Sequence, residues 1–133
     1  MSSTKSNTIK ISACDNQLFV FAVNQSNKDL SYQICNIKSG NFNTVDVTIA
    51  LSEGTFAGTY ALDGVNQNLN DSTTVNLPAG DYVLYYAGIN WGGPYNFDFT
   101  FNKDQYKLPN NPNQPLDGVI WSKGDNDITF SIA

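Results

Sequence analysis

Regular alternation of apolar and polar side chains is the feature that most limits how this chain can fold. It is clearest in residues 44–52, TVDVTIALS, where Val45, Val47, Ile49 and Leu51 alternate with small or polar residues. A period of two places the apolar side chains on one face of a β-strand. A helix would need an apolar period of about 3.6 residues with capping signals, and the sequence shows none. The alternation therefore predicts an all-β protein.

Further segments carry a strand signal, and turn-forming residues separate them at intervals of about ten residues. The predicted strands are residues 8–12, 18–23, 30–38, 44–52, 56–64, 82–89, 95–101, 118–122 and 127–132. Short strands at this spacing are typical of sandwiches and barrels, and strands that are apolar on one face favour two packed sheets. We predict one domain over residues 1–133, an antiparallel two-sheet β-sandwich of about 8–10 strands.

Some segments allow more specific expectations. The run LFVFAV at residues 18–23 is apolar throughout, which suits a strand buried on both faces. Residues 44–52 and 56–64 are joined by a Glu-Gly-Thr turn and are expected to form a hairpin. The segments expected to lie outside strands are a flexible terminus at residues 1–7, a polar loop at residues 65–73 and a long Pro/Asn-rich loop at residues 102–116.

Charge and composition exclude several classes of function. The chain has 12 acidic residues against 7 Lys and Arg, a formal net charge of −5. Its basic residues form no patch, so nucleic acid is not an expected partner. Histidine, the commonest general base, is absent, and the single glutamate, Glu53, lies in a predicted turn. We therefore predict no enzyme and no catalytic residue, and the acidity itself is explained by solubility.

The two cysteines and the N-terminal sequence bear on the compartment. Cys14 and Cys35 are too few for a zinc site without histidine. Both are placed in strand regions, which favours buried reduced thiols, with one disulfide as the alternative. The first residues, MSSTKSNTIK, contain no apolar signal region, and no apolar run is long enough to span a bilayer. We expect a cytoplasmic protein and leave release by a non-classical route open.

Residues 85–99, YYAGINWGGPYNFDF, concentrate aromatic side chains. Alternation assigns most of them to strand faces, but Trp91 lies in the connection between two strands and is followed by two glycines. Its ring is either an anchor that folds back on the core or a platform for a ligand, and both remain open. Sugars stack their CH faces on aromatic rings and form hydrogen bonds with amides and carboxylates. The candidate ligand-binding residues are therefore Asn90, Trp91, Tyr95, Asn96 and Asp98.

Acidic residues in two predicted loops are candidate metal ligands. Asp71 lies in NLNDS, and Asp125 and Asp127 lie in KGDND. Clustered carboxylates suit calcium, although neither loop matches the EF-hand pattern, and turns stabilised by their own Asp side chains explain the same residues. Apart from this calcium, no cofactor is expected.

Among possible functions, the sequence favours a non-enzymatic, lectin-like protein that binds a glycan or glycoconjugate. Weak sugar sites often act through multivalency, so a homo-oligomer is expected with it. The second hypothesis is a structural or interaction protein that assembles with itself or with a protein partner. The third is a membrane-binding or pore-forming β-sandwich protein, since exposed tyrosine and tryptophan favour bilayer interfaces.

Overall fold

A computed structural model describes residues 7–40, 43–109, 117–123 and 128–132. Within these ranges the chain forms ten strands and no helix. The strands are β1 (Asn7–Asn24), β2 (Ser31–Ser39), β3 (Val45–Glu53), β4 (Tyr60–Gly64), β5 (Leu69–Leu77), β6 (Gly80–Asn90), β7 (Asn96–Phe101), β8 (Asp104–Leu108), β9 (Gly118–Lys123) and β10 (Thr129–Ile132). The all-β prediction is confirmed.

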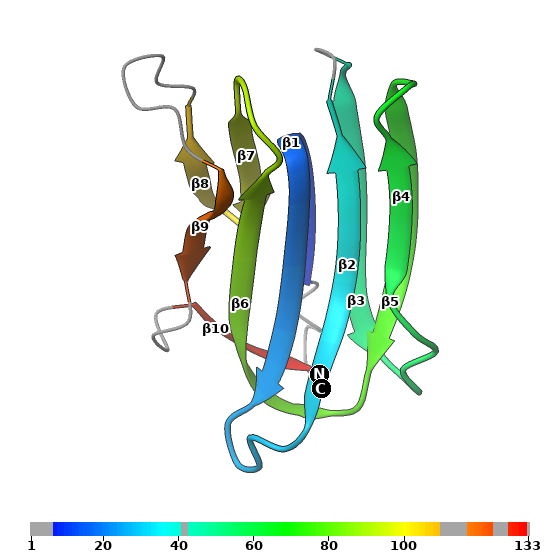
Figure 1. The fold of residues 1–133 in the computed structure, drawn as a ribbon. Coiled ribbons are helices and arrows are strands. Elements are labelled where there is room, and N and C mark those ends of the chain that lie inside the picture. The colour runs from blue at the N-terminus through cyan, green and yellow to red at the C-terminus, as the bar shows by residue number, and fades with distance from the viewer. Residues whose placement is uncertain (1–6, 41–42, 110–116, 124–127, 133) are drawn as a thin grey trace.

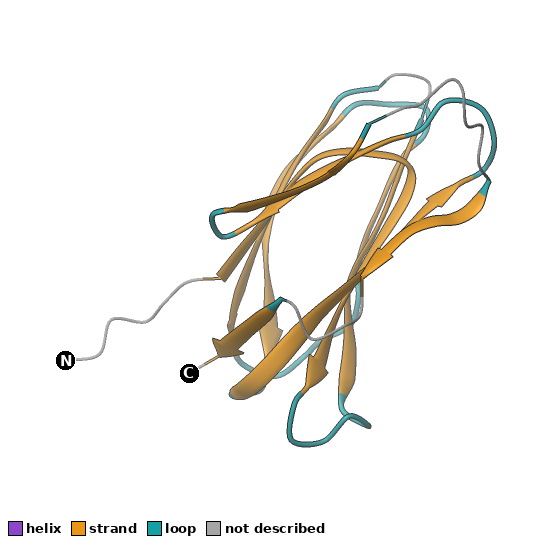
Figure 2. Cartoon of the chain, turned by 90° about the vertical axis from the view of Figure 1, so that its left-hand side faces the viewer, coloured by secondary structure: helices purple, strands orange, loops and turns teal. Residues whose placement is uncertain are grey.

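The strands form two layers that face one another across the core (Figure 1, Figure 2). In the back layer of Figure 1 the order is β5-β3-β1-β7-β8, and in the front layer it is β4-β2-β1-β6. The strands β9 and β10 follow one another along the outer edge of β6. This arrangement is the predicted two-sheet sandwich, except that the pairs β2–β4 and β3–β5 are parallel rather than antiparallel.

The long strand β1 belongs to both layers. Residues 7–15 pair with β3 and β7, whereas residues 15–24 pair with β2 and β6. The strand rises in the back layer, folds over at the upper end of Figure 1 and descends in the front layer. Residues 8–12 and 18–23 were expected to be separate strands. The structure joins them into one strand, because the polar residues between them continue to pair, first with β7 and then with β2.

Three local expectations were wrong. Residues 44–52 and 56–64 do not form a hairpin: β3 pairs in parallel with β5 in the back layer, and β4 pairs in parallel with β2 in the front layer. Residues 65–73 are not all loop, because β5 begins at Leu69. The loop predicted at 102–116 contains β8, whereas residues 110–116 and 1–6 lie outside the described residues. Alternation identifies a strand face but does not identify the strand's partner.

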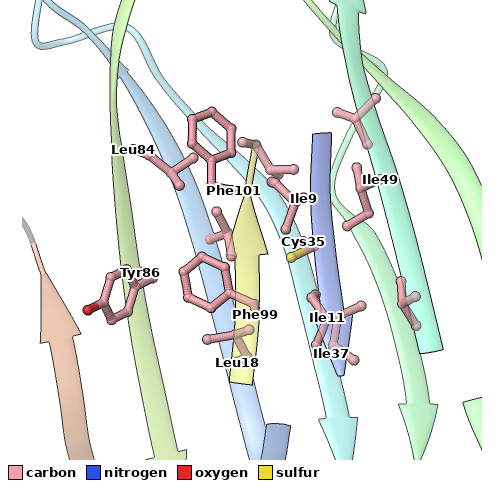
Figure 3. Packing of buried hydrophobic residues seen from close by; sticks show 14 of the residues in the cluster. Ile9, Ile11, Leu18, Cys35, Ile37, Ile49, Leu84, Tyr86, Phe99 and Phe101 are labelled. Carbon is pink, nitrogen blue, oxygen red and sulfur yellow. The ribbon is translucent and has the colours of Figure 1, made fainter. Parts of the chain in front are cut away.

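The core lies between the inner faces of the two layers (Figure 3). Ile9 and Ile11 from the first half of β1 meet Leu18 from its second half, together with Ile37 and Ile49 from β2 and β3. All five side chains are fully buried. Burial of an aliphatic side chain of this size contributes about 1.5–3 kcal/mol to the free energy of folding. Because β1 belongs to both layers, its buried side chains connect the two layers within one core.

An aromatic cluster fills the side of the sandwich between β7, β8 and β9. Its closest ring pair is Tyr86 and Trp121, whose centroids lie 4.5 Å apart. Gly88 makes room for the cluster, because a Cβ atom there would lie 2.9 Å from Cε1 of Phe97. The cluster consists of Tyr86, Phe97, Phe99, Tyr106 and Trp121.

Both cysteines are buried and free, which agrees with the expected reduced thiols. Burial raises the pKa of Cys35 to about 12, and burial is also the main cause that raises the pKa of Cys14, with a smaller contribution from Cys35. A thiol with a raised pKa carries little thiolate at neutral pH and is a poor nucleophile.

We therefore expect the native protein to resist alkylation by iodoacetamide at pH 8 and to take up two labels in urea. Mass spectrometry of the intact chain measures both states. Rapid labelling of both cysteines without denaturant would contradict the buried position of these thiols.

Candidate functional site

A pocket opens where β1 leaves β3. Pairing of β1 with β3 ends at Ile11, but pairing with β7 continues to Asp15 after a register shift between Ile11 and Ala13. The separation leaves a pocket of about 580 Å³ beside the fold of β1. Its polar lining is contributed by the fold of β1, the β2–β3 connection and the start of β7, and includes Ser12, Asp15, Ser39, Asn43, Asn96 and Asp98.

Asp15 is the most unusual polar group in this pocket. Its Oδ1 atom is buried, and no donor in the described part of the chain reaches it. Burial raises the pKa of this carboxyl. A buried carboxylate oxygen without a hydrogen bond is unfavourable, and a ligand hydroxyl that displaced the side chains covering Oδ1 would remove that cost.

Asp98 provides a second carboxylate farther along the pocket. Gln105 donates a hydrogen bond of 2.9 Å from Nε2 to Oδ1 of Asp98. Lys107 lies directly opposite Asp98 in the β7–β8 ladder and also lines the pocket. The pocket lining therefore carries one ammonium group and two carboxylates. This mixture of donors and acceptors suits a polyhydroxylated ligand better than a bare divalent cation, which prefers several unopposed oxygens.

The structure divides the five ligand-binding residues predicted from the sequence. Tyr95, Asn96 and Asp98 line the pocket, although the Tyr95 ring is buried and forms its wall. Asn90 and Trp91 are not among the lining residues.

Asn90 holds the turn that follows β6. Its buried side chain donates a hydrogen bond of 3.0 Å from Nδ2 to the carbonyl oxygen of Gly93. Gly92 and Gly93 have φ angles of 122° and 78° in this turn, a region that disfavours other residues. The two glycines therefore shape the turn that carries Trp91, as the sequence suggested.

Trp91 projects from that turn next to the fold of β1. Its backbone N–H donates a hydrogen bond of 2.8 Å to Oδ1 of Asn16, the residue after Asp15. The side chain is 49% exposed, so it does not act as an anchor within the core. Of the two roles left open by the sequence, this exposure favours the platform.

Sequence reasoning did not find Asp15, Ser39 or Asn43. These residues are far apart in the chain, and only the fold of β1 brings them to the start of β7. One signal was present: the polar residues of SACDNQ, 12–17, interrupt two apolar runs. Such an interruption marks a place where a strand leaves a covered sheet.

The candidate calcium ligands do not lie at this pocket. Asp71 is exposed on β5, where it accepts a hydrogen bond from the phenol of Tyr60. Burial, and then this hydrogen bond, raise the pKa of Tyr60. Asp125 and Asp127 lie outside the described residues. Across the described ranges, no three cysteine, aspartate or glutamate side chains gather in a way that would hold a metal ion.

A second hollow lies at the opposite end of the sandwich, between the β3–β4 connection and the β5–β6 turn. Its volume is also about 580 Å³, and its lining includes Tyr32, Glu53 and Phe56. The rings of Tyr32 and Phe56 lie 5.1 Å apart. Because it contains one carboxylate and two partly buried aromatic rings, this hollow is a natural comparison for the pocket at Asp15.

The chain matches no protein-family model, and no curated protein or solved structure shows significant similarity to it. In the described residues there is also no helix that is long and apolar enough to cross a membrane. The case for a function therefore depends on the geometry of the pocket.

Proposed function

We propose that this protein binds a carbohydrate, without turnover, in the pocket at Asp15. The observation that carries the proposal is the buried Oδ1 of Asp15, which accepts no hydrogen bond from the described protein. Sugar hydroxyls donate and accept at once, and the pocket offers acceptors at Asp15 and Asp98 and an amide at Asn96. Its volume falls within the range of about 300–1,000 Å³ typical of small-molecule sites.

The exposed ring of Trp91 supports a saccharide in particular. The turn that carries it lies beside the fold of β1 at the upper end of Figure 1. The hydrogen bond from its backbone to Asn16 fixes the turn next to Asp15. A sugar that donates a hydroxyl to Asp15 can place its CH face against an aromatic ring on the same end of the molecule. We therefore assign Trp91 to an outer part of the site rather than to the pocket.

A binding role fits the available groups better than catalysis. The chain has no histidine, and its pocket joins one desolvated carboxyl, Asp15, to a second carboxyl already held by Gln105. Glycoside hydrolysis by paired carboxyls requires one proton donor and one base or nucleophile set across the bond. The Gln105 amide instead donates a hydrogen bond to Asp98 and holds it as a fixed acceptor.

A glycan array tests the proposal. The intact protein is expected to bind a subset of glycans, with and without a calcium chelator. Asp15→Ala should reduce binding to those glycans at least about tenfold, since hydrogen bonds to charged groups contribute about 1.5–3 kcal/mol. The matched control is Glu53→Ala, which removes a carboxylate from the hollow at the opposite end and should leave binding unchanged.

Two results would contradict the proposal. The first is a blank array for the intact protein in both conditions. The second is a larger loss from Glu53→Ala than from Asp15→Ala, which would move the site to the other hollow. Circular dichroism of each variant confirms that the fold is retained.

A further inference from the structure

The outer face of the front layer is apolar along β1 and β6, and no strand of the described chain covers that part, whereas its β2 side is polar, with Asn36 and Gln33 opposite Phe19 and Phe21. Phe19, Phe21 and Val23 of β1 lie opposite Ala87, Tyr85 and Val83 of β6. Val119 of β9, 63% exposed, lies opposite Ile89 at the end of the same row. None of these side chains belongs to the core cluster, although Val83 is itself buried; the others on β1 and β6 are partly exposed, and Val119 is exposed. We call this surface the apolar face: Phe19, Phe21, Val23, Val83, Tyr85, Ala87, Ile89 and Val119.

The outer face of the back layer is polar, and it provides a comparison within the same protein. There, Lys10 of β1 lies between Thr48 of β3 and Thr100 of β7. Polar residues are the usual composition of a sheet face in contact with water. Since β1 contributes to both layers, one strand is polar outside in its first half and apolar outside in its second half. The second half therefore has the composition of a strand buried on both faces.

We propose that a second copy of this chain covers the apolar face, so that two front layers pack face to face about a twofold axis. The shape of the apolar face favours this packing. The rings of Phe19 and Phe21 stack with centroids 6.2 Å apart and form a ridge along β1. Beside them is a hollow of about 230 Å³ lined by Val23, Val83 and Tyr85. A twofold axis places the ridge of each copy against the hollow of the other.

The distribution of charge also favours this packing. The apolar face contains no charged side chain, although the chain has a net charge of −5. Charged residues stand at its margin, where Lys28 borders the hollow, Lys38 lies opposite Gln17 on β2, and Asp81 accepts a hydrogen bond from Ser131. An uncharged centre surrounded by positively and negatively charged residues allows two copies to pack together without placing like charges opposite one another. A strongly charged partner would meet no oppositely charged side chain at the centre of the apolar face.

The size of the surface is consistent with a dimer. Residues 17–23 of β1, with β6 on one side and β2 on the other, define a surface about 30 Å by 20 Å, including the reach of one side chain at each margin. The apolar face forms its centre, and Gln33, Asn36 and Lys38 of β2 form part of its polar rim. A second copy would cover roughly 600 Å² on each partner, or about 1,200 Å² in all, which is where specific interfaces begin. This is too small for an obligate dimer, so dimerisation should depend on protein concentration.

Sedimentation velocity of the full chain over a range of micromolar concentrations tests the interface. The wild-type protein should shift with concentration from its monomer mass of 14.6 kDa to twice that mass. Ala87→Glu, which places a charge opposite Phe19, and Phe21→Thr, which removes half of the ridge, should each weaken dimerisation at least about tenfold. Ala50→Glu is the matched control, since it introduces the same charge on the outer face of the back layer and should leave the dimer intact.

Several outcomes would overturn the proposal. One is a wild-type monomer at every concentration, and another is a dimer that persists in both folded variants. A third is a wild-type protein that stays monomeric and co-sediments with vesicles of phosphatidylcholine and cholesterol, with this vesicle binding lost in Phe21→Thr. That result would assign the apolar face to a membrane. The pocket at Asp15 lies away from this face, so the glycan array and the sedimentation experiment can fail independently.

Discussion

Replacing Phe99 with alanine is expected to lower the free energy of unfolding by about 3–5 kcal/mol. Phe99 is fully buried (Figure 3) and belongs to the aromatic cluster. Its ring centroid lies 5.2 Å from those of Tyr86 and Tyr106 and 5.7 Å from that of Trp121. Because those rings come from three other strands, they cannot all collapse into the cavity that alanine would leave. The loss is a large part of the 5–15 kcal/mol that stabilises a typical domain.

Urea denaturation followed by circular dichroism measures this loss at one fixed protein concentration. Phe56→Ala provides the matched control, since the same change at a partly buried ring beside the opposite hollow should lower the free energy of unfolding by less. A loss below about 1 kcal/mol for Phe99→Ala would show that the aromatic cluster is loosely packed. An equal loss for both variants would show that the cluster is no more important than the margin of the core.

Much of this fold could be predicted from the sequence, because alternation reports directly on which side chains face a core. The segment at Val45–Leu51 forms β3 with the predicted residues buried. Its partners could not be read in the same way. The turn after β3 looked like a hairpin turn, but the chain crosses to the other layer there, and β4 joins β2 instead. That choice depends on which inner faces meet across the core, and it leaves no local pattern.

The candidate site was predicted only in part, because some of its residues are far apart in the sequence and meet only in the folded chain. Tyr95, Asn96 and Asp98 were found because an aromatic and Asn-rich segment follows a glycine turn. Asp15 was missed, since its position depends on the long-range fold of β1 and its buried oxygen on the neighbours that this fold brings together. The run at 18–23 was expected to be buried on both faces, but only Leu18, Val20 and Ala22 are buried, and the residues that alternate with them are partly exposed. Sequence alone could not say that one of its faces lies outside the chain's own core.

Replacing Asp15 with asparagine is expected to stabilise the fold at neutral pH while it weakens glycan binding. Burial raises the pKa of Asp15 in the folded protein above the value of about 3.9 for an unfolded chain. The folded state therefore holds this proton more tightly than the unfolded state does. As the pH rises through the raised pKa, the desolvated carboxylate forms and the wild-type protein loses stability. Asparagine has nearly the same shape and never carries that charge.

The pH dependence distinguishes this cause from a general change in net charge. The gain in unfolding free energy from Asp15→Asn should be present at pH 7 and should disappear below about pH 4, where Asp15 is protonated in both states of the wild-type protein. Asp98→Asn alters the net charge equally at the same pocket, but it replaces a carboxylate held by Gln105 and should bring no gain. Urea titrations at both pH values measure the difference. Equal gains for the two variants would assign the effect to the acidity of the whole chain. A gain confined to Asp15 would mean that this protein keeps a destabilising carboxylate in its pocket, as expected where a group is retained for binding rather than for folding.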